Sequence, residues 1–105
     1  MKTLKVKTRL GEFECHINLG KYTNGNTCLS LSTVDCLPFA NLTVNLGDVR
    51  ANDYAFLDTN NSPFSQYLMK EYKLGEYADF NQISGWCVYP LYKLNLDEIK
   101  KYTKQ

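Results

Sequence analysis

The alternation of apolar and polar residues near the N-terminus is the strongest constraint on how this chain can fold. Apolar side chains occupy every second position in residues 4–6 and 13–19, and charged or polar side chains lie between them. A period of two is typical of a half-buried β-strand. A turn at Leu10-Gly11 would pair Val6 with Cys15 on one face and basic with acidic residues on the other. The segment therefore predicts an antiparallel hairpin.

A second turn is marked by the pair Asn24-Gly25, which is common in hairpin loops of two residues. A two-residue loop, however, would place the apolar residues of the two strands on opposite faces. A three-residue loop over residues 23–25, with Gly25 in a left-handed conformation, aligns Leu19 with Leu29. The apolar pattern therefore favours the three-residue loop.

A helix is predicted over residues 63–73. Ser62 is a favourable N-cap, and Pro63 fits the first helical position because a backbone N–H is not needed there. The apolar residues of the segment recur at helical spacing, and Gly75 suits the left-handed residue that often follows a helix.

Strand patterns occur on both sides of this helix. Residues 42–46 alternate, residues 54–58 form a short strand, and residues 83–96 are strand-like with apolar side chains at both parities, whereas residues 76–82 are expected to be a loop. We therefore predict an α+β fold, with an antiparallel sheet of about five strands and one main helix packed on one face. The length is that of a single domain, residues 1–105.

The charge balance and the hydrophobic pattern narrow the class of protein. Twelve basic and eleven acidic residues do not give the single-sign field on which strongly basic nucleic-acid binders or acidic DNA mimics depend. The sequence contains neither the apolar run of a signal peptide nor that of a membrane span. We therefore expect a cytoplasmic protein, in which the four cysteines are thiols rather than disulfides.

Catalytic and metal-binding patterns are weak. The single histidine, His16, lies on the charged face of its predicted strand, and no known motif places a serine or cysteine beside it. The cysteines lack the close pairs of zinc sites, and the loop acids lack the spacing of a calcium loop. We therefore predict no catalytic residue, no metal and no cofactor.

Aromatic residues give the strongest functional signal. Eight tyrosines and one tryptophan are more than a small core buries with every hydroxyl bonded, and both residue types are enriched in protein interfaces. We predict that Trp86, Tyr89 and Tyr92 bind a partner, with Asn60 and Asn61 before the helix as a second candidate. The alternative is that Trp86 and Tyr92 simply pack over the helix.

Three blocks within residues 37–95 carry a resemblance to known proteins: LPFANLTVNLGD, AFLDTNNSPFSQYL and SGWCVYPLYKLN. They resemble a family of small uncharacterised proteins of bacterial phages, plasmids and conjugative elements. The resemblance implies an accessory or counter-defence protein, of which anti-CRISPR proteins are one kind. We therefore expect a non-enzymatic protein that binds and inhibits a bacterial defence effector, such as a nuclease complex. A nucleic-acid-binding accessory protein is the alternative.

Overall fold

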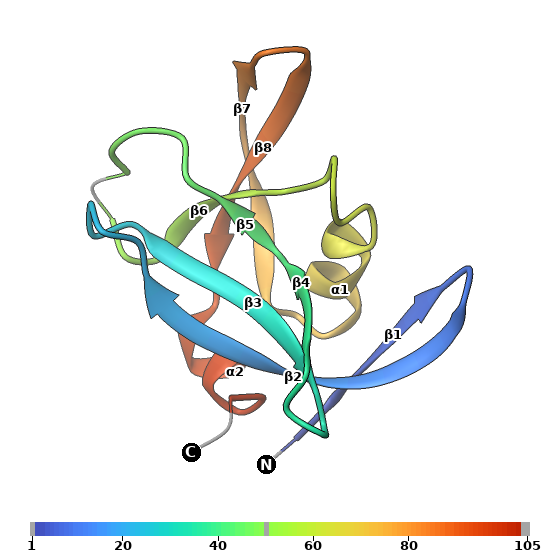
Figure 1. Ribbon diagram of the computed structural model, residues 1–105. Coiled ribbons are helices and arrows are strands. Elements are labelled where there is room, and N and C mark those ends of the chain that lie inside the picture. Colours follow the sequence, from blue (N-terminus) through green and yellow to red (C-terminus); the bar gives the residue numbers. More distant parts are fainter. Residues whose placement is uncertain (1, 50, 104–105) are drawn as a thin grey trace.

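The computed structural model describes residues 2–49 and 51–103, which form two antiparallel β-sheets and two short helices (Figure 1). The first sheet has the strand order β1-β2-β3-β4, with β1 at Leu4–Thr8, β2 at Gly11–Lys21, β3 at Thr27–Thr33 and β4 at Pro38–Asn41. The second has the order β5-β6-β8-β7, with β5 at Thr43–Val44, β6 at Tyr54–Leu57, β7 at Gly75–Ser84 and β8 at Cys87–Leu94. The helices are α1, Ser65–Glu71, and α2, Leu96–Lys100.

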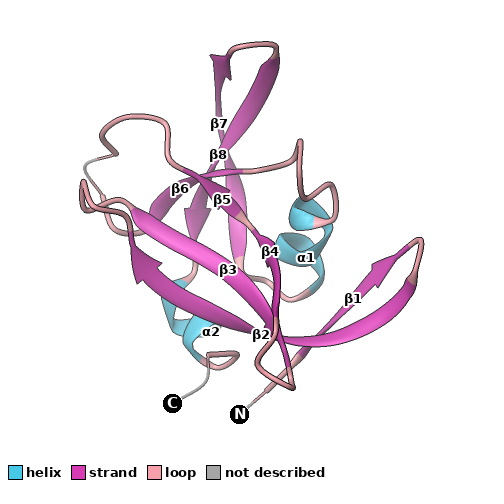
Figure 2. Ribbon diagram, viewed as in Figure 1, coloured by secondary structure: helices cyan, strands magenta, loops and turns pink. Residues whose placement is uncertain are grey.

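The predicted α+β fold, one sheet of about five strands under one main helix, was wrong. The strands divide between two four-stranded sheets, as Figure 2 shows. Residues 76–82, expected to be a loop, lie within β7. The helix predicted over residues 63–73 shortens to the seven residues of α1. The fold is therefore mostly β.

Local conformation explains the short helix. The Ser62 hydroxyl, expected to cap the helix, instead donates to the carbonyl of Asn41 at 2.6 Å, and α1 begins after Phe64 without a side-chain cap. At the other end the chain turns at Lys73, which has a φ of 56°, a conformation uncommon for residues other than glycine. Gly75 is therefore not the end of the helix but the first residue of β7.

The β1–β2 hairpin forms, but its register differs from the predicted one by two residues. Val6 pairs with Phe13 rather than with Cys15. The Thr8 hydroxyl stabilises the tighter turn because it donates to the carbonyl of Gly11 at 3.1 Å. A shift of two residues leaves every side chain on its predicted face, so alternation alone cannot distinguish the two registers.

The β2–β3 hairpin confirms the predicted three-residue loop. Leu19 pairs with Leu29, the N–H of Tyr22 donates to the carbonyl of Asn26 at 2.8 Å, and Gly25 has a φ of 89°. Here the competing loop differed by one residue and would have moved one strand's apolar side chains to the other face. The apolar pattern was therefore sufficient to select the loop.

The chain passes from the first sheet to the second at Leu42. Its N–H donates to the carbonyl of Leu29 in β3, and its carbonyl accepts the N–H of Asp58, just after β6, both at 2.9 Å. The side chain of Thr43 accepts the Leu29 N–H at 3.0 Å and is hydrogen-bonded to the Tyr22 hydroxyl at 2.9 Å. Of the alternating segment 42–46, predicted as a strand, only Thr43–Val44 forms one, as β5 of the second sheet, and Thr43 is buried.

The core is one cluster to which both sheets and both helices contribute. The N–H of Lys5 in β1 donates to the hydroxyl of Tyr72 at the end of α1, at 2.8 Å. The N–H of Ile17 in β2 donates to the carbonyl of Tyr102 after α2, also at 2.8 Å. Fully buried members of the cluster include Leu4, Ile17, Leu31, Leu57, Leu68 and Ile99.

His16, expected on the exposed charged face of its strand, is instead buried, with only 3% of its surface exposed. α2 contacts β2, and Thr103 forms a parallel bridge with Ile17, which brings the C-terminal segment alongside this strand. The ring Nδ1 of His16 has no hydrogen-bond partner among the described residues. The local pattern of β2 carries no information about contacts with the other end of the sequence.

Replacing Thr43 tests the connection between the sheets. We expect Thr43→Val to lower the free energy of unfolding by about 1–3 kcal/mol, because the buried N–H of Leu29 would lose this acceptor. The matched control is Thr3→Val, whose hydroxyl donates to Glu14 at an exposed position and which should change stability by less than about 0.5 kcal/mol. Urea denaturation followed by circular dichroism measures both, and equal losses would contradict this account of Thr43.

Gly75 offers a second test of the packing. A Cβ there would lie 2.8 Å from the carbonyl oxygen of Lys93 and 3.3 Å from the sulfur of Met69. We expect Gly75→Ala to lower the free energy of unfolding by about 1–3 kcal/mol, since a backbone oxygen in a paired strand cannot easily move. Gly20→Ala is the control, because a Cβ at Gly20 would have no atom within 4 Å. If both variants unfold at the same urea concentration, the close approach at Gly75 is unimportant.

Candidate functional site

β7 and β8 form a hairpin whose outer half extends beyond the rest of the second sheet (Figure 2). β8 pairs with β6 through residues 91–93, whereas it pairs with β7 over residues 87–94. Residues 81–84 and 87–90 therefore form a two-stranded ribbon. Such a ribbon buries little surface by itself, and Ile83, Ser84 and Val88 are among its exposed residues.

A tight turn joins the two strands of this ribbon. Ser84 pairs with Cys87, so that Gly85 and Trp86 alone form the loop, and Gly85 has a φ of 61°. A positive φ at the first loop position is the requirement of a type II′ turn, where glycine is favoured. The turn places Trp86 at the outer end of the hairpin, and its relative exposure of 103% means that no other residue covers it.

One face of the ribbon is apolar. Ile83 and Val88 are direct cross-strand partners, and such partners share a face. Their side chains are 73% and 53% exposed. Phe80, before the ribbon, is also largely exposed, and its ring centroid lies 6.2 Å from that of Phe56. We call the exposed apolar residues in the outer part of this hairpin, Phe80, Ile83, Trp86 and Val88, the hairpin patch.

The hairpin patch lies in an uncharged part of the chain. Residues 80–92 contain no Asp, Glu, Lys, Arg or His, and within the described sheet β7 is an edge strand. Exposed edge strands are usually protected from unwanted pairing by charged side chains. Depletion of charge and enrichment of aromatic residues are instead features of the centres of protein interfaces. The patch therefore has the composition of a contact surface.

A bulge in β7 separates the ribbon from the rest of the sheet. Residues 78–80 stand opposite Leu91 of β8, and Asp79 has a φ of 56°. Bulges bend a strand and change the direction in which its side chains point. The bulge therefore lets the inner part of β7 remain in the sheet while the ribbon follows a different course.

The other face of the ribbon is polar and partly covered. Gln82 and Tyr89 are cross-strand partners on this face, and both are half-buried. The pKa of Tyr89 is raised, first by a hydrogen bond with the Cys87 side chain, then by partial loss of water and by the negative charges of Cys87 and Asp58. The Tyr89 hydroxyl is therefore neutral at physiological pH. The two faces differ in character, and the apolar one is the open one.

The structure does not gather the five residues predicted to bind a partner into one site. Trp86 does not pack over the helix, whereas Tyr92 is buried and its hydroxyl accepts a hydrogen bond from Gln66 of α1 at 3.2 Å. Six residues of an extended strand span about 20 Å, which separates Tyr92 from the tip. Tyr89 lies between them on the polar face.

Asn60 and Asn61 lie in an exposed turn after β6. The buried carboxylate of Asp58 accepts the N–H of Asn61 at 3.2 Å and its side-chain amide at 3.1 Å. The turn is thus held by its own hydrogen bonds, and the polar segment 58–63 has a structural explanation.

Besides Trp86, the hairpin patch contains three residues that were not predicted to bind a partner: Phe80, Ile83 and Val88. The uncharged run 80–92 was a signal for them.

In residues 2–49 and 51–103, no group of three or more His, Cys, Asp or Glu side chains is placed to hold a metal ion. Neither of the two helices described above has the length and apolar character needed to span a bilayer.

Two antiparallel sheets and a projecting ribbon with an exposed apolar face define a small, mostly β protein. A family model described as domain of unknown function (DUF4313) matches residues 16–105, and the chain belongs to this family. The matched region contains the whole of the β7–β8 hairpin. No curated protein and no solved structure matches the chain.

The exposure of Trp86 predicts that it contributes little to folding. We expect Trp86→Ala to change the free energy of unfolding by less than about 0.5 kcal/mol, as for other surface substitutions. Leu68→Ala, at a fully buried position of α1, should lower it by about 2–5 kcal/mol. Urea denaturation of both variants is the measurement, and a large loss in Trp86→Ala would show that the indole packs against the protein.

Proposed function

We propose that this protein is a non-enzymatic binding protein and that the hairpin patch is its contact surface for another protein. The observation that carries the proposal is the complete exposure of Trp86 at the end of an uncharged ribbon. Tryptophan is the residue type most enriched among those that dominate binding energy, and truncating such a residue typically costs about 2 kcal/mol or more.

The shape of the hairpin indicates the kind of surface that it fits. A ribbon that projects from a sheet can enter a recess of a partner, with the indole of Trp86 at the deepest point. Ile83 and Val88 would then exclude water around that contact on the apolar face. The polar face, with Gln82 and the Tyr89 hydroxyl, would lie at the rim of the interface, where polar residues are usual.

We further propose that the partner is a bacterial defence effector, such as a nuclease complex, and that binding inhibits it. This part rests on the resemblance of three sequence blocks to proteins of phages, plasmids and conjugative elements. The block SGWCVYPLYKLN runs from Ser84 to Asn95 and includes Trp86 and all of β8. The resemblance therefore covers much of the hairpin that carries the proposed contact.

Nucleic-acid binding has less support from the charge distribution. Lysines of β1 face glutamates of β2, in the pairs Lys5 with Glu14 and Lys7 with Glu12. A basic patch on one face is the usual feature of a nucleic-acid-binding protein, and this pairing weakens the most basic row of the chain. Nucleic acid is therefore kept as an outcome of the experiment below.

The test is made in a bacterial host that has an active nuclease-based defence system. The tagged wild-type protein should raise the plating efficiency of a targeted phage and should co-purify with the nuclease complex from a nuclease-treated lysate. Trp86→Ala should keep the fold and lose both effects, with a fall in affinity of about thirtyfold. Leu10→Ala is the matched control, because Leu10 is also an exposed apolar residue, 89% exposed, at a different hairpin turn.

Three results would contradict the proposal. Equal losses in Trp86→Ala and Leu10→Ala would indicate non-specific apolar adhesion. Recovery of the protein with RNA or DNA that disappears on nuclease treatment would favour the nucleic-acid alternative. A purified protein that is dimeric, and becomes monomeric in Trp86→Ala, would show that the patch pairs two copies of this chain.

A further inference from the structure

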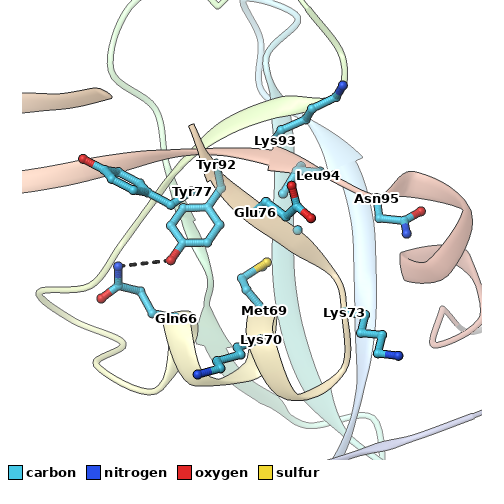
Figure 3. A pocket seen from close by; sticks show the side chains of 11 residues that line it. Gln66, Met69, Lys70, Lys73, Glu76, Tyr77, Tyr92, Lys93, Leu94 and Asn95 are labelled. Atoms are coloured by element: carbon cyan, nitrogen blue, oxygen red, sulfur yellow. Dashed lines mark hydrogen bonds between the residues drawn. The ribbon is translucent and has the colours of Figure 1, made fainter. Parts of the chain in front are cut away.

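A cleft of about 860 Å³ lies between α1 and the inner ends of β7 and β8 (Figure 3). No residue of the hairpin patch lines it. The apolar side chains of Met69 and Leu94 form part of its wall. Its volume falls within the range of pockets that hold small molecules, about 300–1,000 Å³. The cleft is thus a second surface, distinct from the proposed protein contact.

Two tyrosines form an aromatic side of the cleft. Tyr77 and Tyr92 are cross-strand partners in β7 and β8, and their ring centroids are 5.9 Å apart. Tyr92 is held in the core and by the hydrogen bond from Gln66. Tyr77 is 42% exposed, so part of its ring remains open to a planar group.

Charged residues also line the cleft. Lys70 and Lys73 lie on the α1 side of the cleft (Figure 3). Glu76 and Lys93 are cross-strand partners next to Tyr77 and Tyr92, so their side chains start from the opposite face of the sheet. Within the described part of the chain none of these lysines forms a salt bridge. The charged side chains on the aromatic side of the cleft are therefore two cations, Lys70 and Lys73, in a chain whose net charge is +1.

We propose that this cleft binds a small anionic ligand that carries a planar ring, the chemistry shared by mononucleotides. The lysines would neutralise a phosphate group, since ammonium groups bind phosphate as point charges. The open face of Tyr77 would stack on the ring, as aromatic side chains do with every base.

The test is a titration of the ¹⁵N-labelled full chain, followed by two-dimensional NMR. The probes are adenosine 5′-monophosphate, uridine 5′-monophosphate, adenosine and inorganic phosphate. We expect both mononucleotides to shift the amide signals of residues 75–77 and 92–95, and to bind more tightly than adenosine or phosphate. The absence of shifts there at millimolar mononucleotide would overturn the proposal.

Variants separate the contributions of charge and ring. Lys70→Ala and Lys73→Ala should each raise Kd for the mononucleotides by about two- to fivefold, the range of an exposed ion pair. Lys7→Ala, in β1 and outside the cleft lining, should leave Kd unchanged. Tyr77→Ala should reduce mononucleotide binding to the level of phosphate, whereas Tyr77→Phe should retain it because the ring remains.

Two further outcomes would overturn the proposal. If Lys7→Ala weakens binding as much as Lys70→Ala, the binding is diffuse charge attraction rather than a site. If a short polyglutamate peptide shifts the same amide signals and binds more tightly than the mononucleotides, the cleft is a site for an acidic protein segment. The hairpin patch takes no part in these measurements, so their result is independent of the proposed function.

Discussion

The hydrogen bonds of Leu42 to both sheets are the constraint on which the rest of the structure depends. Its N–H is bonded to β3, its carbonyl accepts the N–H that follows β6, and its side chain is fully buried. A buried backbone group must have a partner, so the chain can change sheets only where both groups are satisfied. The hydrogen bond of Leu42 to Asp58 fixes the end of β6. β6 pairs with β8, and β8 is one strand of the projecting hairpin. The position of the candidate contact surface therefore follows from a residue far from it in the sequence.

The predictions from sequence succeeded where the competing conformations placed apolar side chains on different faces of a sheet. The loop between β2 and β3 was selected because the competing loop would have moved Leu19 away from Leu29. The register of the first hairpin was missed because the two candidates place the same side chains on the same faces. The division into two sheets and the burial of His16 and Thr43 depend on contacts with segments distant in the sequence. A local pattern of residues does not predict such contacts.

The candidate site shows the same limit. Trp86 was among the residues predicted to bind a partner, but apolar residues at both parities of its segment left its exposure undecided. β7 was taken for a loop because the bulge at residues 78–80 interrupts the period of two, and this hid Phe80 and Ile83 from the prediction. The cleft beside α1 could not be predicted either, since it forms where Gly75 brings the backbone of β7 close to Met69 and Lys93.

The place of the single tryptophan has a practical consequence. Most globular proteins bury tryptophan on folding, so that its fluorescence reports on the core. The indole of Trp86 is fully exposed to solvent in the folded protein. In the unfolded chain it would also be exposed to solvent. The fluorescence emission of Trp86 should therefore change little when the protein unfolds. It should change when another molecule covers the end of the β7–β8 hairpin. The chain thus carries a native optical probe of association.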